Sequence, residues 1–291
     1  MTIENKQGLY KQQGLTQAEL DEIGTLASLC EAYEHLHMKL NWNTLHTRPK
    51  NQTNDFLYYE NGVLIGFLAF FSFNPIEAEV SGMVHPEHRR RHVFTQLFSA
   101  AYEECQHRNI PTLLLIVEHN SASGQGFAAA LKPKYQHSEY KMELAEVKTL
   151  PELDAHLLFR QATLNDVPIL VHITAISFAL TEQDVDWYTT NRMQNEKNKQ
   201  FLATLDGVPI GKLDISLEVN EAYISGFGVL PPFRGRGYGR QILAQAIREI
   251  LMTGQNRVVL EVATDNKNAL SLYQLCGFRE VSSYDYYSLP M

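Results

Sequence analysis

The sequence predicts a mixed α/β protein built from two tandem copies of one domain. The chain has 291 residues, which is long for one ordinary domain and sufficient for two that each bury a core. Strand-like and helix-like segments alternate along it, and one ordered set of short motifs occurs twice. Each copy is therefore expected to be an α/β domain of the α+β type with a mixed sheet.

The repeat has an offset of 145 residues, which is the length of a whole domain. A period of this size indicates a duplicated domain and not a solenoid of short repeats. With an offset that is one residue larger, Asn120 corresponds to Asn266. The motif at 61–66 recurs at 206–211, the motif at 84–86 recurs at 229–231, and the motif at 89–91 recurs at 234–236.

The two copies divide the chain near its middle. Residues 147–157 contain Pro151 and several charged side chains, which is typical of a linker. The first domain is therefore expected at 1–146 and the second at 158–291.

The second copy shows alternating strand and helix patterns. Ile169, Ile173 and Ile176 have helical spacing, and the Asp206-Gly207 pair is typical of a tight hairpin turn. The predicted strands are 158–162, 200–205, 208–217, 222–229, 258–262 and 284–289, and the predicted helices begin near Asn165 and cover 238–253 and 268–275.

A loop rich in glycine and arginine, residues 234–240, lies between an apolar strand and an amphipathic helix. Its glycines let the backbone approach a ligand and accept unusual dihedral angles. Free N–H groups at the start of the helix, together with the helix dipole, form an anion site. The arginines add positive potential, so the loop suits a pyrophosphate. The alternative is a tight strand-to-helix turn with solvated arginines.

Two common nucleotide-binding motifs do not fit this loop. A P-loop ends in Gly-Lys-Ser/Thr, whereas Gly239 is followed by Arg240 and Gln241. A dinucleotide fingerprint has the spacing G-x-G-x-x-G after the first strand of its fold. This loop has the spacing G-x-G-x-G and follows a later strand.

The residues around the loop resemble the acetyl-CoA signature of the GNAT superfamily of N-acetyltransferases. The first motif is Arg-x-x-Gly-x-Gly at 234–239, preceded by Val-x-Pro at 229–231. The start of such a domain is matched at 160–166, so the resemblance covers residues 158–291. The second motif of the superfamily is matched in order and spacing by Val262, Asn266, Ala269, Leu272, Tyr273, Gly277 and Phe278.

The resemblance implies that acetyl-CoA is the cosubstrate and that the second copy binds it. The pantetheine arm is expected to pair with the backbone of Phe227, Gly228 and Val229, and an N–H near Val229 to stabilise the thioester oxyanion. Asn266 is expected to bind the pantetheine, with Asn268 as a weaker candidate. The pyrophosphate is expected on Arg234, Gly235, Arg236, Gly237, Tyr238 and Gly239.

The resemblance also implies that Tyr273 is the general acid. When an amine attacks the thioester, CoA leaves as a thiolate whose conjugate acid has a pKa of about 8.5, like that of cysteine. A phenol held against the sulfur can supply the proton as the bond breaks. The alternative for Tyr273 is an aromatic core residue on an amphipathic helix. Asp214 and Glu221 are weaker candidates for the general base, and a solvated carboxylate at a strand edge is the alternative for each.

The first copy departs from this pattern at the loop and at the acid. His92 and Phe94 stand where Gly237 and Gly239 stand in the second copy, and their side chains are expected to crowd the backbone that would approach a phosphate. Phe127 takes the place of the tyrosine. The first copy is therefore expected to be a degenerate domain with a structural role.

The composition limits the partners and the location of the protein. The net charge of −8 argues against a protein that coats nucleic acid. The N-terminus lacks the apolar core of a secretory signal, and the longest apolar run, near 63–73, is shorter than the about 20 residues that span a bilayer. A cytoplasmic protein that binds neither nucleic acid nor a membrane is expected, and no feature predicts its oligomeric state.

Neither the cysteines nor the histidines predict a metal site. The cysteines are three in number and far apart, which suggests neither a disulfide framework nor zinc. His85, His88 and His92 are interspersed with arginines that would repel a cation.

The sequence therefore predicts an N-acetyltransferase that moves an acetyl group from acetyl-CoA to the amine of a small molecule or peptide. Two alternatives remain open. One is a sensor or scaffold that binds acetyl-CoA or CoA without turnover, and the other is acyl transfer to a thiol or hydroxyl. The acceptor cleft carries no signature that identifies its ligand.

Overall fold

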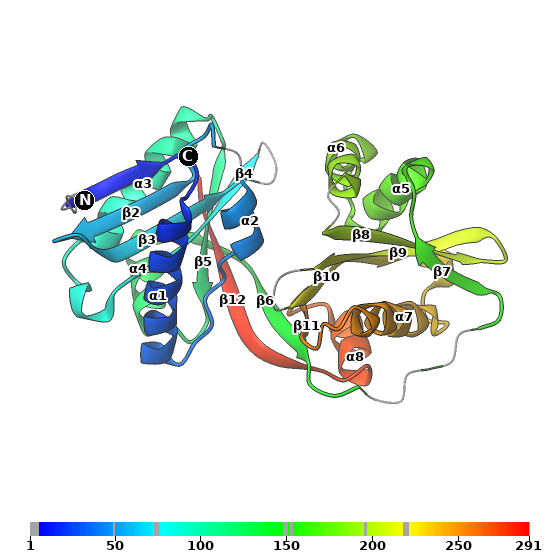
Figure 1. The fold of residues 1–291 in the computed structure, drawn as a ribbon. Helices are drawn as coiled ribbons and strands as arrows, with labels where there is room; N and C mark the ends of the chain where they lie inside the picture. Colours follow the sequence, from blue (N-terminus) through cyan, green and yellow to red (C-terminus); the bar gives the residue numbers. More distant parts are fainter. Residues whose placement is uncertain are drawn as a thin grey trace. The chain divides into compact units, whose positions relative to one another are not determined.

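The chain forms two compact units, each of them a mixed α/β domain as predicted (Figure 1). Unit 1 comprises Met1–Glu139 with Ser282–Met291, and unit 2 comprises Tyr140–Val281. The computed structural model describes residues 6–48, 50–72, 76–147, 151, 154–194, 197–217 and 221–290, without the side chains of Trp187, Tyr188 and Pro290.

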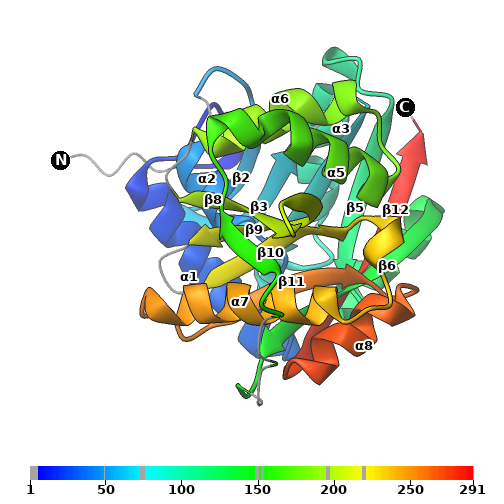
Figure 2. The same ribbon diagram turned by 90° about the vertical axis from the view of Figure 1, so that its right-hand side faces the viewer.

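Unit 1 has the strand order β1-β2-β3-β4-β5-β12, in which β12 (Phe278–Pro290) is the last strand of the chain. Strands β4 and β5 are parallel, and the other pairs are antiparallel. Helix α1 packs on one face of this sheet, and α3 and α4 pack on the other (Figures 1 and 2). The elements are β1 (Gly8–Gln12), α1 (Gln17–Glu34), α2 (Trp42–Thr47), β2 (Asp55–Glu60), β3 (Val63–Phe71), β4 (Glu77–Val84), the 3-10 turn Pro86–His88, α3 (Val93–His107), β5 (Thr112–Glu118), α4 (Ala122–Leu131) and β6 (Lys134–Leu144).

Unit 2 has the strand order β6-β11-β10-β9-β8-β7. Helices α5 and α6 cover one face of β8–β10, and α7 and α8 cover the other (Figures 1 and 2). The elements are β7 (Leu157–Gln161), the 3-10 turn Leu164–Asp166, α5 (Val167–Phe178), α6 (Glu182–Met193), β8 (Asn198–Leu205), β9 (Val208–Leu217), β10 (Ala222–Val229), the 3-10 turn Pro231–Phe233, α7 (Tyr238–Met252), β11 (Val258–Ala263), α8 (Lys267–Leu275) and β12 (Phe278–Pro290).

The duplication extends to the details of the backbone. Strands β4 and β10 begin and end 145 residues apart, and so do helices α3 and α7. The β2–β3 hairpin shifts its register between Tyr58 and Tyr59, and the β8–β9 hairpin does so between Ala203 and Thr204. The repeat seen in the sequence is therefore a repeat of the fold.

The last strand of the chain does not close the copy that precedes it. The sequence assigned 284–289 to the second domain, but β12 pairs with β5 of unit 1 over Tyr284–Pro290. Its side chains alternate between the faces, so Tyr284 and Tyr286 pack with Leu114 and Ile116. Tyr287 and Leu289 pack against the cluster on the other face.

The boundary between the units also differs from the expected linker. Unit 2 begins at Tyr140, within β6, whereas the sequence placed the start of the second domain at 158. Residues 148–150 and 152–153 of the predicted linker lie outside the described residues. The other predicted elements of the second copy are present within two residues of their expected bounds. Helix α6 was not predicted, because its sequence has no continuous apolar stripe.

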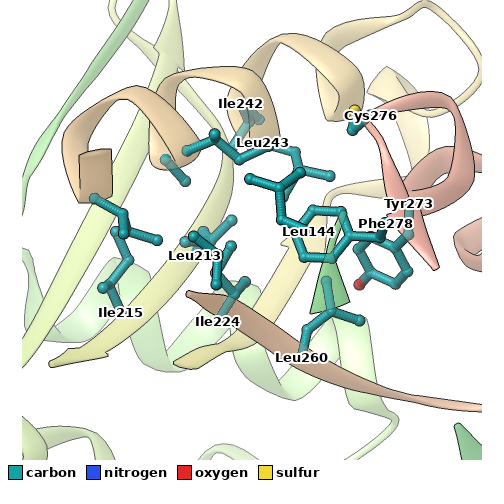
Figure 3. Packing of buried hydrophobic residues seen from close by; sticks show 14 of the residues in the cluster. Leu144, Leu213, Ile215, Ile224, Ile242, Leu243, Leu260, Tyr273, Cys276 and Phe278 are labelled. Carbon is teal, nitrogen blue, oxygen red and sulfur yellow. The ribbon is translucent and has the colours of Figure 1, made fainter. Parts of the chain in front are cut away.

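A core beneath α7 holds the strands of unit 2 in place. Ile242 and Leu243 of α7 face Leu213 of β9 and Ile224 of β10 (Figure 3). Each fully buried aliphatic side chain of this kind contributes about 1.5–3 kcal/mol relative to an exposed one. The cluster also includes Tyr273 of α8, so the predicted acid is anchored in the same core (Figure 3).

Within the described residues, the structure can be compared with what a membrane-spanning protein and a metal-binding protein require. No single helix there is long and apolar enough to cross a membrane, although the bent pair Leu164–Phe178 and Glu182–Met193 passes on length and composition. No group of three or more His, Cys, Asp or Glu side chains in those ranges is arranged to hold a metal ion. The three cysteines are free and buried.

Candidate active site

Strands β10 and β11 separate at the predicted cosubstrate site. They pair in parallel from Ala222–Val258 to Ile224–Leu260, and both strands continue beyond the last pair. The separation exposes one edge of β10 between its pairing with β11 and the loop that starts α7. This edge carries Phe227, Gly228 and Val229, the residues that the sequence assigned to the pantetheine arm.

A bulge interrupts β10 at that edge. Ser225 pairs with Asp214 and Gly228 with Lys212, so Gly226 and Phe227 together oppose one residue of β9. A bulge of this kind re-aims the backbone and is common next to active sites. The sequence did not predict it.

The backbone of Val229 points away from β9. Leu230 N donates to Ile210 O at 2.8 Å, and Val229 stands opposite Gly211. Because hydrogen-bonded and non-hydrogen-bonded pairs alternate along an antiparallel ladder, the N–H and C=O of Val229 face the side on which β11 has separated. The C=O accepts a hydrogen bond from Arg234 Nε at 2.7 Å, so this arginine ties the loop to the end of β10.

The loop before α7 leaves its backbone open. Gly235 and Gly237 have φ values of 73° and 83°, and a Cβ built on either would meet no atom within 4 Å. Helix α7 starts after Gly237 with no described side chain capping it, so the N–H groups of its first turn remain available. Tyr238, Gly239 and Arg236 complete the predicted anion site, which the chain brings together in one turn.

Helix α8 approaches the same place. A Cβ on Gly239 would lie 3.6 Å from Leu272 Cδ2, and 3.8 Å from atoms of Phe227 and Val229. The start of α7, the bulged edge of β10 and Leu272 therefore lie together. Tyr273, the next residue, belongs to the buried cluster against which Phe227 and Val229 pack.

Tyr273 is a buried phenol of α8. Its side chain is 7% exposed, and its ring lies 6.0 Å from that of Phe278 in an edge-to-face arrangement. Burial, with a smaller contribution from Cys276, raises the pKa of Tyr273 to about 12. The hydroxyl therefore stays protonated at neutral pH, as an acid requires, although burial in the core fits the structural alternative equally well.

The two predicted asparagines are exposed at the start of α8. Asn266 caps this helix, because its Oδ1 accepts from Ala269 N at 3.2 Å. The carbonyl end of Asn266 therefore has a structural partner. Binding of pantetheine by Asn266 or Asn268 stays a prediction.

The geometry separates the two candidates for the base. Glu221 precedes β10 and forms ion pairs with Arg257 at 3.3 Å and Lys141 at 3.9 Å. Since a strand rises about 3.3 Å per residue, Glu221 lies roughly 23 Å from Gly228. Asp214 stands opposite Ser225, next to the bulge, and it is buried.

Asp214 lines a cavity of about 230 Å³ between the sheet and the helices α5 and α6. Its Oδ2 accepts from Lys212 Nζ at 2.9 Å, and Arg192 Nε lies 3.9 Å from the same oxygen. The sequence did not single out Lys212 or Arg192. The signal was present in the alternation of β9, where Lys212, Asp214 and Ser216 fall on one face of a strand whose other face is apolar. The lining residues are Thr174, Phe178, Leu180, Val185, Thr189, Arg192, Gln200, Lys212, Asp214, Ser225 and Gly226.

Ser177 of α5 is a further polar group that the sequence analysis missed. A Cβ on Gly228 would lie 2.2 Å from Ser177 Oγ, so the hydroxyl contacts the backbone of β10 beside Val229. The hydroxyl is buried and has no hydrogen-bond partner among the described residues. It is thus available to a ligand that enters beside the bulge.

Gly226 makes room for the buried ion pair, which predicts the effect of a Cβ there. It has a φ of 54°, and a Cβ would lie 2.4 Å from Asp214 Oδ2 and 3.1 Å from Lys212 Nζ. We expect Gly226→Ala to lower the free energy of unfolding by about 2–4 kcal/mol, because left-handed strain and overpacking add. Gly207→Ala is the matched control, since Gly207 has a φ of 80° with open space around its Cβ. Equal losses in urea denaturation of the two variants would show that Asp214 is not held against the bulge.

Unit 1 repeats the loop conformation without the glycines. Arg90 and His92 have φ values of 62° and 60°, like their counterparts Gly235 and Gly237. The ring of Phe94 packs edge-to-face on Phe127 at 4.7 Å and against the core of unit 1. Phe94 and His92 also line the cavity at this loop, so the expected crowding of a phosphate stays a prediction.

Unit 1 also contains the larger cavity, of about 530 Å³. Strands β4 and β5 pair in parallel only from Glu77–Thr112 to Val80–Leu115, and the cavity is lined by the parts of both strands beyond this point. Residues of the loop, of α1 and the segment that follows it, of α3, of α4 and of β12 complete the lining. Its volume is within the range of about 300–1,000 Å³ that is usual for ligand sites.

Two features of the second copy are missing from the first. Strands β3 and β4 pair one to one from Gly66–Val84 to Phe71–Glu79, so the bulge has no counterpart among these pairs. The caps of α4 and α8 are Ser121 and Asn266, and the residues seven positions later are Ala128 and Tyr273. Ala128, and not Phe127, therefore takes the place of the tyrosine, because the connection before α4 is one residue longer than the expected match of Asn120 with Asn266 implied.

Known proteins resemble this chain in both copies. The Acetyltransferase (GNAT) family profile matches residues 20–131 and 170–278. A mycothiol acetyltransferase of Corynebacterium glutamicum strain R is 24% identical over 227 residues, which are 70% of this chain and 73% of that protein. The N-alpha-acetyltransferase MAK3 of Arabidopsis thaliana is 35% identical over 92 residues, which are 30% of this chain and 48% of that protein.

Solved structures share the fold over almost the whole chain. A GCN5-related N-acetyltransferase from Sphaerobacter thermophilus matches 97% of this chain and 95% of its own with a TM-score of 0.79 and 18% identity. A tandem GNAT protein from the clavulanic acid biosynthesis pathway matches 97% and 98% with a TM-score of 0.73 and 16% identity. With both copies matched by the family profile, the chain belongs to the GNAT acetyltransferase family as a tandem-domain member.

Proposed function

We propose that unit 2 transfers an acetyl group from acetyl-CoA to an amine. The observation that carries this proposal is that two groups meet at the separated edge of β10 and a third lies in the buried cluster packed against that edge. These groups are the open first turn of α7, the outward-facing backbone of Val229 and the buried phenol of Tyr273. In unit 1 the third group is replaced by Ala128.

The residues present fit acetyl-CoA at its phosphate end. The open N–H groups of α7 suit a pyrophosphate, and no Cβ stands in the way at Gly235 or Gly237. Arg240 Nε in the first turn of α7 is buried and has no hydrogen-bond partner among the described residues, which an anion would supply. When bound, acetyl-CoA supplies an activated thioester.

Different residues of unit 2 then donate and accept the protons that move in the reaction. The amine nitrogen forms a bond to the carbonyl carbon, and the carbon–sulfur bond breaks. Val229 N–H donates to the carbonyl oxygen as charge develops on it, and Tyr273 donates its proton to the leaving sulfur. Asp214 accepts the proton that the amine loses, through water where the distance requires it. The products are an amide and the free thiol of CoA.

Release of the CoA thiol tests this function. Purified full-length protein with acetyl-CoA is expected to release thiol in proportion to added amine, and slowly without it. Amines, thiols and alcohols of the same carbon skeleton separate the three acceptor classes. Tight binding of acetyl-CoA with no thiol release from any acceptor would support the alternative of a binding module.

The cavity of unit 1 favours a second function for that copy, which is binding without turnover. It lies where the cosubstrate site lies in unit 2, and helix α3 begins there with no described side-chain cap. Unit 1 lacks the bulge and has Ala128 at the position of Tyr273, so the acid proposed for unit 2 has no counterpart there. Titrations of wild type and of a Gly237 variant with acetyl-CoA distinguish binding by the two copies, because Gly237 belongs to unit 2 alone.

A further inference from the structure

A row of buried polar side chains forms the floor of the cavity in unit 2. Lys212 and Asp214 of β9 are 3% and 2% exposed. Gln200 of β8 and Ser225 of β10 stand directly opposite Asp214 on the two neighbouring strands. Directly opposed residues of antiparallel strands share a face, so these side chains form one row beneath α5 and α6.

The other copy of the fold shows that this row is not required for folding. At the same offset of 145 residues, Lys212, Asp214 and Ser216 correspond to Phe67, Ala69 and Phe71 of unit 1. Those three residues belong to an ordinary apolar cluster beneath α1. Burial of charged groups is costly compared with an apolar core, so the row has a cost in stability that the apolar counterparts in unit 1 do not have.

Two acceptor atoms in the row lack donors. Asp214 Oδ1 and Gln200 Oε1 are buried and have no hydrogen-bond partner among the described residues. The other end of the Gln200 amide is fixed, because its Nε2 donates to Thr189 O at 2.9 Å. Two oxygens in need of donors, on adjacent strands of the same cavity, suit the hydrogens of an amino group.

The charges of the cavity favour an acid on the same ligand. Its charged lining residues are Lys212, Arg192 and Asp214, which sum to one positive charge. A simple cationic amine would add a second positive charge beside side chains that are largely buried. A ligand that carries a carboxylate beside its amine adds no net charge as a zwitterion and offers a negative group to Lys212 and Arg192.

The remaining wall of the cavity sets the size and the polarity of the ligand. Phe178, Leu180 and Val185 present apolar side chains from α5, α6 and their connection. The volume of about 230 Å³ is smaller than the sites of drug-sized molecules, which start at about 300 Å³. A small metabolite with an apolar side chain fits this description.

We propose that the acceptor of unit 2 is a small apolar α-amino acid in its zwitterionic form. Its amino group lies against Asp214 Oδ1 and Gln200 Oε1, and its carboxylate faces Arg192 and Lys212. This inference rests on the proposed acetyl transfer and names its substrate class. In the balanced reaction the ammonium form and acetyl-CoA give the N-acetyl amino acid, CoA thiol and one proton, which leaves through Asp214.

Three matched acceptors test the proposal. L-leucine carries both charges, L-leucinamide lacks the negative charge, and 3-methylbutylamine lacks the carboxyl group altogether. We expect kcat/KM for thiol release with L-leucine to exceed that with either analogue by about 10- to 100-fold, the effect of a hydrogen bond between charged groups. A better rate with the amide would point to a peptide N-terminus and would overturn the proposal, as would equal rates with all three.

A variant tests which residue binds the carboxylate of the acceptor. Arg192→Gln is expected to reduce the preference for L-leucine over 3-methylbutylamine to about 3-fold or less, because the carboxylate loses a charged partner that the simple amine never had. Arg192 also donates to Ser216 Oγ at 3.0 Å, so the ratio between the two acceptors is compared and not the absolute rate. Arg279→Gln is the control, since Arg279 is exposed and pairs only loosely with Glu146, at 3.8 Å. A uniform loss with every acceptor in Arg192→Gln would mean that Arg192 has a structural role, and the proposal would fail.

Binding without turnover distinguishes this inference from the proposed function. Calorimetry of L-leucine and 3-methylbutylamine into full-length protein saturated with CoA requires no chemistry. Binding of L-leucine without thiol release from acetyl-CoA would leave the substrate class standing and refute the acetyl transfer. Amine-dependent thiol release without a preference for the zwitterion would support the acetyl transfer and refute the substrate class.

Discussion

Replacing Tyr273 with phenylalanine is expected to lower kcat by about 10²–10⁴-fold, the usual contribution of a positioned general acid. The affinity for acetyl-CoA is expected to change little, because the phenylalanine ring would keep the contact with Phe278 and the place in the core. Steady-state thiol release measures the first effect, and calorimetry with acetyl-CoA measures the second.

Tyr223→Phe is the matched control for this substitution. Tyr223 lies on β10 of the same unit, and its hydroxyl donates to Glu261 at 2.9 Å, away from the bulge. The control removes one phenol from the same sheet and is expected to keep kcat within about 3-fold of wild type. If both variants lost activity to the same degree, the effect of Tyr273→Phe would be a loss of structure.

The pH dependence of kcat gives an independent check on Tyr273. The active form of an acid is the protonated one, so activity is lost as pH rises through its pKa. Because burial raises the pKa of Tyr273 to about 12, no fall in kcat due to this residue is expected below about pH 11. A descending limb near pH 9 in wild type that vanishes in Tyr273→Phe would contradict the burial of the phenol in the active state.

The sequence was sufficient for the features that depend on local pattern and on repetition. The offset of 145 residues recurs in the bounds of β4 and β10 and of α3 and α7. The Asp206-Gly207 turn joins β8 to β9 as predicted, because a tight hairpin needs positive φ at both positions. The motif residues of the loop, of β10 and of α8 lie close together in unit 2, as the resemblance implied.

The pairing of the last strand, β12, with β5 of unit 1 could not be predicted from the repeat. A strand with apolar residues on both faces can pair with either of two homologous edges, and the sequence of β12 contains no feature that selects one. In the structure Tyr284 and Tyr286 are buried with Leu114 and Ile116 of unit 1. Long-range pairing of this kind depends on tertiary packing and not on local propensity.

The bulge and the row of polar residues were missed for different reasons. A bulge adds one residue to one strand, and neither Gly226 nor Phe227 alone signals it in a single sequence. The row was visible as Lys212, Asp214 and Ser216, but alternating polar residues are normally read as the solvated face of a strand. Only the covering helices α5 and α6 show that this face is buried.

The loop of unit 1 keeps the backbone conformation of its counterpart although a histidine replaces the glycine. His92 adopts a φ of 60° where Gly237 has 83°, so the strain of a left-handed residue, about 1–2 kcal/mol, is tolerated in this fold. What a side chain does at this position depends on where its Cβ points. At Gly237 the Cβ would face open space beside the first turn of α7.

Gly237→Phe is therefore expected to block the phosphate site of unit 2 without unfolding the chain. We expect calorimetry with acetyl-CoA to give two sites per chain in wild type and one in the variant, with the affinity of unit 2 lowered by about 100-fold or more because several charge-assisted contacts are lost. Thiol release is expected to fall with it, since unit 1 lacks the tyrosine and the bulge.

Gly207→Phe separates the loss of binding from backbone strain. Gly207 has a φ of 80° and the same open space around its Cβ, but it lies in the turn between β8 and β9. Both variants therefore add the same ring to the same kind of backbone, and only Gly237→Phe adds it beside the N-terminus of α7. An unchanged isotherm for Gly237→Phe would mean that the pyrophosphate binds elsewhere. A single site in wild type that Gly237→Phe removes would mean that the cavity of unit 1 does not accept acetyl-CoA, and that the first copy supports the second by structure alone.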